Sequence, residues 1–139
     1  MPMKVLIADD DRVLSHMLAT RLRALGWAID LAGDAMQTVM FAMRGQPDVI
    51  VLDIQMPGGT GIDALRKLKA SVKTAQIPVV VVSGSVAPEE EAAIVGLGAA
   101  RFVRKPVDGD ALHEILREVT SAASSPGPAA TRYATERST

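Results

Sequence analysis

Four hydrophobic runs in this 139-residue chain end at polar residues of the kinds that can handle a phosphoryl group. The residues that follow these runs are Asp9 and Asp10, then Asp53, Ser83 and Lys105. The runs are continuous and mostly β-branched, which is typical of parallel strands buried on both faces. Because open parallel sheets bind ligands outside the carboxyl ends of their strands, we expect these side chains to gather at one sheet edge.

Carboxylates crowded into one crevice repel one another. A pair about 4 Å apart costs roughly 4 kcal/mol at an effective dielectric constant near 20. Protonation or a hard cation relieves this repulsion, and Mg²⁺ prefers carboxylates together with a phosphate oxygen. Lysine and serine add a positive charge and a hydroxyl donor, the contacts that a transferring phosphoryl group needs. Aspartate can attack phosphate, and Asp53 is the favoured acceptor because it stands alone at its strand end.

The order of elements predicts a doubly wound α/β fold with five strands and five helices. We predict strands over residues 5–8, 27–31, 49–52, 79–82 and 101–104, and helices over about 13–25, 35–43, 62–68, 88–97 and 109–119. In the flavodoxin-like strand order 2-1-3-4-5, the switch point lies between the first and third strands. This order would bring the three aspartates together and place the second strand, interrupted by Asp30, at an edge.

Composition limits the classes of protein that fit. A hydrophobic fraction of 48% supports one folded domain, which we place at residues 1–120, followed by a flexible Ser/Pro/Ala-rich tail or linker at 121–139. A net charge of −1 argues against direct nucleic-acid binding, and the absence of cysteine excludes disulfides and thiolate metal sites. No apolar stretch approaches the roughly 20 residues of a membrane span, so we expect a cytoplasmic protein with no membrane contact.

Four segments at these strand ends together resemble the CheY-like receiver domain of two-component response regulators. They are residues 6–11, 52–57 with Gly61, 82–84 and 103–106, in the right order over about residues 3–120. Each motif is weak alone, but all four on a five-fold strand–helix pattern are specific. The resemblance implies that Asp53 accepts a phosphoryl group from a sensor histidine kinase or a histidine phosphotransfer protein. It also implies a phosphoacceptor that assists its own phosphotransfer and dephosphorylation rather than an enzyme.

The resemblance further implies a magnesium site. Asp10, Asp53 and the backbone carbonyl of Gln55 would ligate Mg²⁺, and Asp9 would act mainly through a bound water. Taken in isolation, Asp9 and Asp10 could instead be loop or helix-capping carboxylates. Asp11 has no role in such a site, and we predict that it caps the first helix.

The resemblance also assigns the residues that respond to phosphorylation. Lys105 would contact a phosphoryl oxygen, and its peptide bond to Pro106 is expected to be cis. Ser83 and Phe102 match the family's switch pair, in which the hydroxyl turns toward the phosphate and the ring packs inward. Two positions depart from the common pattern: Phe102 replaces the frequent tyrosine, and Gly84 replaces the more usual alanine, which should loosen the following loop.

The output of such a receiver is open to several interpretations. It could act alone and bind a downstream protein through the helix 4–strand 5–helix 5 face. It could also form a homodimer when it is phosphorylated. It could also be part of a larger transcription factor, hybrid kinase or signalling enzyme. An aspartate-nucleophile phosphatase fits less well, since Gln55 stands where those enzymes usually carry a second acid. A degenerate scaffold is disfavoured because every charged site residue is present.

One further pattern is apolar. Met36, Met40 and Met43 recur at helical spacing in the second predicted helix. We interpret them as a soft helix face rather than as a binding surface.

Overall fold

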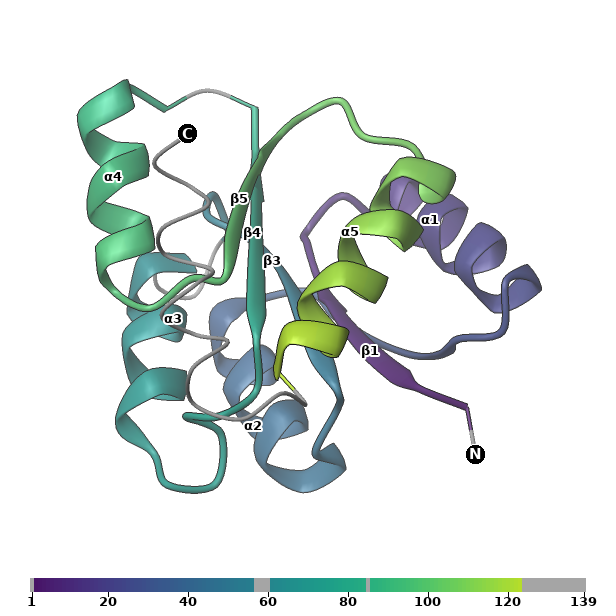
Figure 1. Cartoon of the computed structure of the whole chain (residues 1–139), viewed down its shortest axis with the longest axis horizontal. Helices are drawn as coiled ribbons and strands as arrows, with labels where there is room; N and C mark the ends of the chain where they lie inside the picture. The colour runs from purple at the N-terminus through teal and green to yellow at the C-terminus, as the bar shows by residue number, and fades with distance from the viewer. Residues whose placement is uncertain (1, 57–60, 85, 124–139) are drawn as a thin grey trace.

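The computed structural model of the protein describes residues 2–56, 61–84 and 86–123. Its strands form one parallel sheet in the order β2-β1-β3-β4-β5, which confirms the predicted flavodoxin-like fold (Figure 1). The strands are β1 (Lys4–Ala8), β2 (Ala28–Ala32), β3 (Val49–Asp53), β4 (Val79–Ser83) and β5 (Arg101–Arg104). The helices are α1 (Arg12–Ala24), α2 (Ala35–Gly45), α3 (Gly61–Ala70), α4 (Pro88–Gly96) and α5 (Gly109–Ala123). As expected, β2 lies at an edge.

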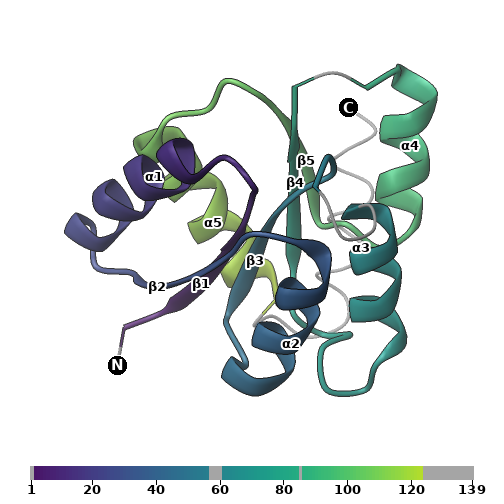
Figure 2. The same cartoon turned by 180° about the vertical axis from the view of Figure 1, so that it is seen from behind.

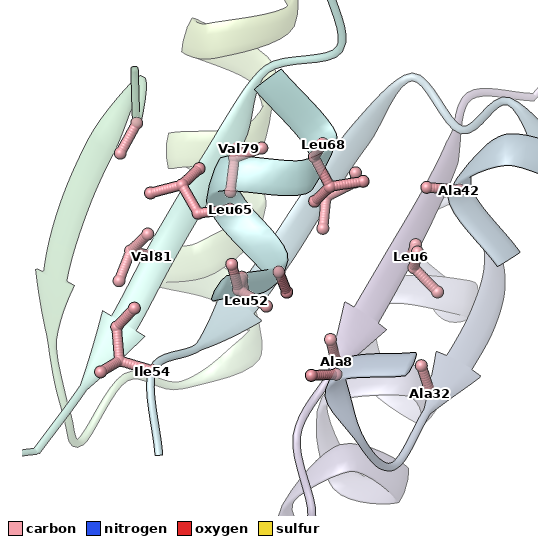
Figure 3. Close-up of a cluster of buried hydrophobic side chains, with 14 of the residues drawn as sticks. Leu6, Ala8, Ala32, Ala42, Leu52, Ile54, Leu65, Leu68, Val79 and Val81 are labelled. Carbon is pink, nitrogen blue, oxygen red and sulfur yellow. The ribbon is translucent and has the colours of Figure 1, made fainter. Parts of the chain in front are cut away.

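The two faces of the sheet bury separate hydrophobic cores, because successive side chains of a strand point to opposite faces. Val5 and Ile7 pack with residues of α1 and α5, whereas Leu6 and Ala8 pack with residues of α2, α3 and α4. Both views show α1 and α5 on one side of the sheet and the other three helices opposite (Figures 1 and 2). Figure 3 shows the second core, in which Leu65 and Leu68 of α3 cover the centre of the sheet.

Local signals set most helix starts. Asp11 accepts a hydrogen bond from the backbone N–H of Leu14, which confirms that it caps α1. Asp34 caps α2 in the same way, and Asp108 accepts from the N–H of Ala111 in the first turn of α5. These caps satisfy N–H groups that a helix start leaves without partners. Of these helices, α1 follows the strand end that carries Asp9 and Asp10, and α5 follows the strand end that carries Lys105.

Most of the predicted boundaries differ from the structure by one to four residues, as two examples show. The second strand begins at Ala28, since the backbone N–H of Trp27 donates to Leu22 O and belongs to the turn that ends α1. The last helix continues through Ala123, so residues 121–123 are helical rather than part of the predicted tail. Serine and alanine are compatible with a helix, so the change in composition at this point did not end it. Residues 124–139 of the tail, and Pro57 of the second motif, lie outside the described residues.

A buried tryptophan joins α5 to the loop before β2. Trp27 is 7% exposed, and its Nε1–H donates to Nδ1 of His113 at 2.9 Å. The two rings meet edge to face, with centroids 6.3 Å apart. His113 therefore acts as a structural hydrogen-bond acceptor.

We predict that His113→Leu lowers the free energy of unfolding by about 1–3 kcal/mol, because the indole N–H loses its acceptor while remaining buried. Urea unfolding monitored by tryptophan fluorescence measures this directly, since Trp27 is the sole tryptophan of the chain. The control is His16→Leu, at the exposed second histidine, for which we expect a change within about 0.5 kcal/mol. Equal effects of the two substitutions would contradict the role given to His113.

Within the part of the chain that the structure describes, no helix is both long and apolar enough to cross a membrane.

Candidate functional site

The carboxyl edge of the sheet brings the predicted acidic residues together. Asp53 ends β3, and Asp9 and Asp10 follow β1, its neighbour in the sheet. One carboxylate oxygen from each of the three residues lies within 4.8 Å of the others. Asp9 and Asp53 are buried, whereas Asp10 is exposed at the mouth of the cluster.

Backbone donors hold the two buried carboxylates in place. The N–H of Asp11 donates to Asp9 Oδ1 at 2.9 Å, and the N–H of Gln55 donates to Asp53 Oδ1 at 3.1 Å. Each donor lies two residues beyond its acceptor, a common turn arrangement for aspartate. In each aspartate the other oxygen, Oδ2, faces the lysine described next. Gln55 has an exposed side chain and a backbone directly beside Asp53.

Lys105 reaches the acidic cluster from the end of β5. Its Nζ lies 3.0 Å from Asp9 Oδ2 and 3.5 Å from Asp53 Oδ2. The backbone N–H of Lys105 donates to Ser83 O at 2.9 Å, and the Lys105–Pro106 peptide bond is cis. The lysine is thereby anchored beside β4 while its ammonium group bridges two carboxylates.

The buried charges shift the pKa values of this site. Burial is the main cause that raises the pKa of Asp53, and the nearby Asp9 carboxylate adds to it. The Gln55 N–H and the Lys105 ammonium oppose that rise without cancelling it. For Lys105, burial alone lowers the pKa, but the carboxylates of Asp9 and Asp53 outweigh burial, so the pKa is raised. The lysine therefore stays charged, and ionised Asp53 is under electrostatic strain.

This strain predicts that removing the Asp53 charge stabilises the fold when divalent cations are absent. The unfolded chain ionises Asp53 at its ordinary pKa and the folded chain at a higher one. Folding therefore carries a free-energy penalty that is complete when the pH lies above the folded-state pKa of Asp53. The penalty shrinks as the pH falls through that pKa, and it is gone below the pKa of Asp53 in the unfolded chain. We expect Asp53→Asn to raise the midpoint of thermal unfolding at neutral pH in EDTA, and to lose this advantage in acid. Thermal melts across this pH range test this, and a variant no more stable than wild type at neutral pH would contradict it.

Ser83 ends β4 with a buried side-chain hydroxyl. Its Oγ is fully buried and has no hydrogen-bond partner among the described residues. A buried hydroxyl without a partner costs free energy, so a ligand that supplied an acceptor here would be favoured. Gly84 follows it, and a methyl group there would come no closer than 4.0 Å to its neighbours, at Lys105 Cβ. The alanine usual in the family would therefore fit, and glycine is not sterically required.

Phe102 and Arg104 connect this edge to α4. The half-buried ring of Phe102 packs against the core on the α3–α4 side, and the Arg104 guanidinium lies 5.7 Å from its centroid. Arg104 Nη2 donates to Glu91 Oε1 of α4 at 2.9 Å, and Nη1 donates to Val86 O at 3.3 Å. No local sequence pattern predicts these contacts of Arg104, because its glutamate partner belongs to a different element.

Gly61 also shapes the acidic site, in a way that the sequence did not show. A Cβ at this position would lie 2.4 Å from Asp53 O and 2.5 Å from Ile54 Cα, and both of these are backbone atoms. Its N–H donates to Ile54 O at 2.9 Å. The first turn of α3 thus approaches the backbone of the acidic site more closely than any other residue type allows.

This combination of a doubly wound fold and an acidic, lysine-bridged strand edge defines the class of CheY-like receiver domains. The family model described as the response regulator receiver domain matches residues 5–117, and the chain belongs to that family.

Comparison with known proteins agrees with this assignment. The chain is 37% identical over 105 residues to the "Probable transcriptional regulatory protein TcrX" of Mycobacterium tuberculosis, covering 76% of this chain and 44% of that protein. Chemotaxis response regulator CheY4 of Vibrio cholerae has the same fold, with a TM-score of 0.80 and 24% identity over 86% of this chain and 99% of that chain. So has the receiver domain of a sensor histidine kinase from Pseudomonas aeruginosa, with a TM-score of 0.79 and 23% identity over 87% and 99%. That structure is described with a magnesium ion coordinated in its active site cleft. The chain spans about half or less of the curated relatives it matches.

Proposed function

We propose that this receiver accepts a phosphoryl group on Asp53 from the phosphohistidine of a sensor histidine kinase or a histidine phosphotransfer protein. The observation that carries the proposal is the convergence of three carboxylates within 4.8 Å, with Lys105 Nζ 3.5 Å from Asp53. In the reaction an Asp53 oxygen forms a bond to phosphorus while the phosphorus–nitrogen bond to the imidazole breaks. The electron pair of that bond leaves with the histidine.

The donor set fits Mg²⁺. Three carboxylates close enough to share one ion, one of them exposed, supply the hard oxygen ligands that this cation prefers, with room for waters. Asp10, Asp53 and the backbone carbonyl of Gln55 would hold the ion, and Asp9 would contribute mainly through a bound water. When bound, the ion would neutralise the carboxylates and stabilise charge on the phosphoryl oxygens.

Lys105 and Ser83 would respond to the phosphoryl group on Asp53. The phosphoryl group carries roughly −1.5 to −2 charges in place of the single negative charge of the Asp53 carboxylate, so the ammonium group, now shared between Asp9 and Asp53, gains a stronger partner. The Ser83 hydroxyl, which lacks a partner among the described residues, gains a phosphoryl oxygen as acceptor. Its movement leaves space for Phe102 to pack inward, which would disturb the contacts of Arg104 with Phe102 and Glu91.

This rearrangement would favour one of two conformations of the α4–β5–α5 face. We propose that this face controls a downstream protein or an output domain within a larger regulator, and that it supports a phosphorylation-dependent homodimer.

Incubation with acetyl phosphate and Mg²⁺, followed by intact-mass measurement, tests the proposal. We expect one phosphoryl group per chain, lost when EDTA replaces Mg²⁺, and a changed elution volume in size-exclusion chromatography if the phosphorylated form dimerises. Rapid turnover of an aryl phosphate would instead support the phosphatase alternative. A chain that takes up no phosphoryl group with Mg²⁺ present would overturn the proposed function.

A further inference from the structure

The methionines of α2 lie on the outside of the molecule rather than in its core. Met36, Met40 and Met43 are 69%, 44% and 38% exposed. The buried residues of this helix are instead Ala35, Thr38 and Ala42. Small residues at these positions let α2 approach the sheet closely, and they leave the methionine row along its solvent side.

This row borders a groove between α2 and α3, which lie side by side in both views (Figures 1 and 2). The groove has a volume of about 450 Å³, and its walls include Met36 and Met40 from α2 and Ala64 from α3. Met43 continues the exposed row beyond the groove, and Met36 and Met43 are two helical turns apart, about 10 Å along the axis. The groove and the row together are long enough for a short helical segment rather than for a single side chain.

The rim of the groove is basic. Arg66 and Lys67 of α3 line it, and Arg44 follows Met43 in the last turn of α2. All three are exposed, and no carboxylate in residues 2–56, 61–84 or 86–123 lies within ion-pair distance of them. Asp63 is the single acidic residue among the described residues that line the groove, and it stands in the first turn of α3, where a negative charge is favourable to the helix. The surface thus combines adaptable apolar side chains with positive charges that have no partner within the described chain.

We propose that this groove, lined by Met36, Met40, Ala64, Arg66 and Lys67, binds an amphipathic helix of a partner protein that carries acidic residues beside its apolar face. Helices bind in such grooves through apolar residues at i, i+3 or i+4, and i+7, and methionine adapts to their shapes. Acidic flanks complement the basic rim and set the orientation. The methionine row is therefore a binding surface, in contrast to its interpretation from the sequence. Because α3 lies between α2 and α4, such a partner leaves the α4–β5–α5 face free (Figures 1 and 2).

The probe is a synthetic amphipathic peptide of about four helical turns, with leucines at i, i+4 and i+7 and glutamates on both flanks. Binding is followed by NMR of ¹³C-methyl-labelled methionine in the whole chain. We expect saturable shifts of the Met36, Met40 and Met43 methyl signals, with no shift of Met17. Met17 is the matched control because it is 65% exposed but lies on α1.

Charge reversal tests the specificity. A second peptide with lysines in place of the glutamates should bind about tenfold more weakly. The double variant R66E/K67E should reverse this preference, while its unfolding midpoint and acetyl phosphate labelling stay at the wild-type level, since both residues are exposed and outside the acidic site. Equal affinity of the two peptides, an equal shift of Met17, or an unchanged preference in the variant would overturn the proposal. Methionine shifts that depend on protein concentration without peptide would identify a second copy as the occupant and overturn it as well.

Discussion

Asp53→Asn is expected to reduce phosphoryl incorporation from acetyl phosphate to the background level while the domain remains folded. The amide has the size of the carboxylate and can still accept the hydrogen bond from the Gln55 N–H. It lacks the negative charge and the nucleophilic oxygen that the reaction requires. Intact-mass measurement after incubation with Mg²⁺ and acetyl phosphate provides the readout.

A matched control separates the loss of this carboxylate from a general effect of an Asp-to-Asn change. Asp34→Asn lies outside the acidic site and preserves the α2 cap, since asparagine caps helices as well as aspartate does. Its labelling should equal that of wild type. Labelling of the Asp53→Asn variant at the wild-type level would contradict the assignment of the acceptor.

A substitution of Lys105 separates acceptance of the phosphoryl group from the response to that group. In Lys105→Ala the acceptor carboxylate is intact, so labelling should remain possible, whereas the ammonium group that would follow the new charge is gone. We therefore expect a labelled chain whose NMR spectrum around Ser83 and Phe102 changes less than that of wild type. This result would show that the two residues have different tasks at one site.

Gly61→Ala is expected to have the largest effect of any single methyl group added near the site. Its Cβ would lie 2.4 Å from Asp53 O and 2.5 Å from Ile54 Cα, so the backbone of the acidic site has to move. Overpacking of this kind costs about 1–3 kcal/mol, and here it also displaces the residues that would hold the metal. We expect a lower midpoint of urea unfolding together with slower labelling by acetyl phosphate.

Gly96→Ala is the matched control for this substitution. Gly96 ends α4 with no atom within 4 Å of an added Cβ, so alanine meets no obstacle there. Alanine is a better helix former than glycine by up to about 1 kcal/mol. Gly96→Ala should therefore be neutral or stabilising, with labelling unchanged. A Gly61→Ala variant as stable and as reactive as Gly96→Ala would show that the close approach has no structural consequence.

Much of the acidic site is a local property of the chain. Asp53 and Ser83 are the last residues of buried strands, and Asp9 follows another, so the hydrophobic runs alone place these side chains at one sheet edge once the sheet is parallel. Helix caps such as Asp11 and Asp108 are equally local, because donor and acceptor are three residues apart. A boundary is not a local property where a neighbouring element competes for the residue, as at Trp27, which completes the end of α1 instead of starting β2.

The sequence by itself therefore determined the fold class and the composition of the acidic edge, because both depend on periodicity and on which residues end the strands. The strand order came from analogy with flavodoxin-like folds. Only the tertiary structure decided the contacts of Arg104 with α4, the close approach of Gly61 to Asp53, and the exposure of Met36 and its neighbours. These features depend on how each helix is rotated and how closely it lies on the sheet. That rotation follows from the packing of small residues such as Ala35 and Ala42 against distant strands, and no local pattern encodes it.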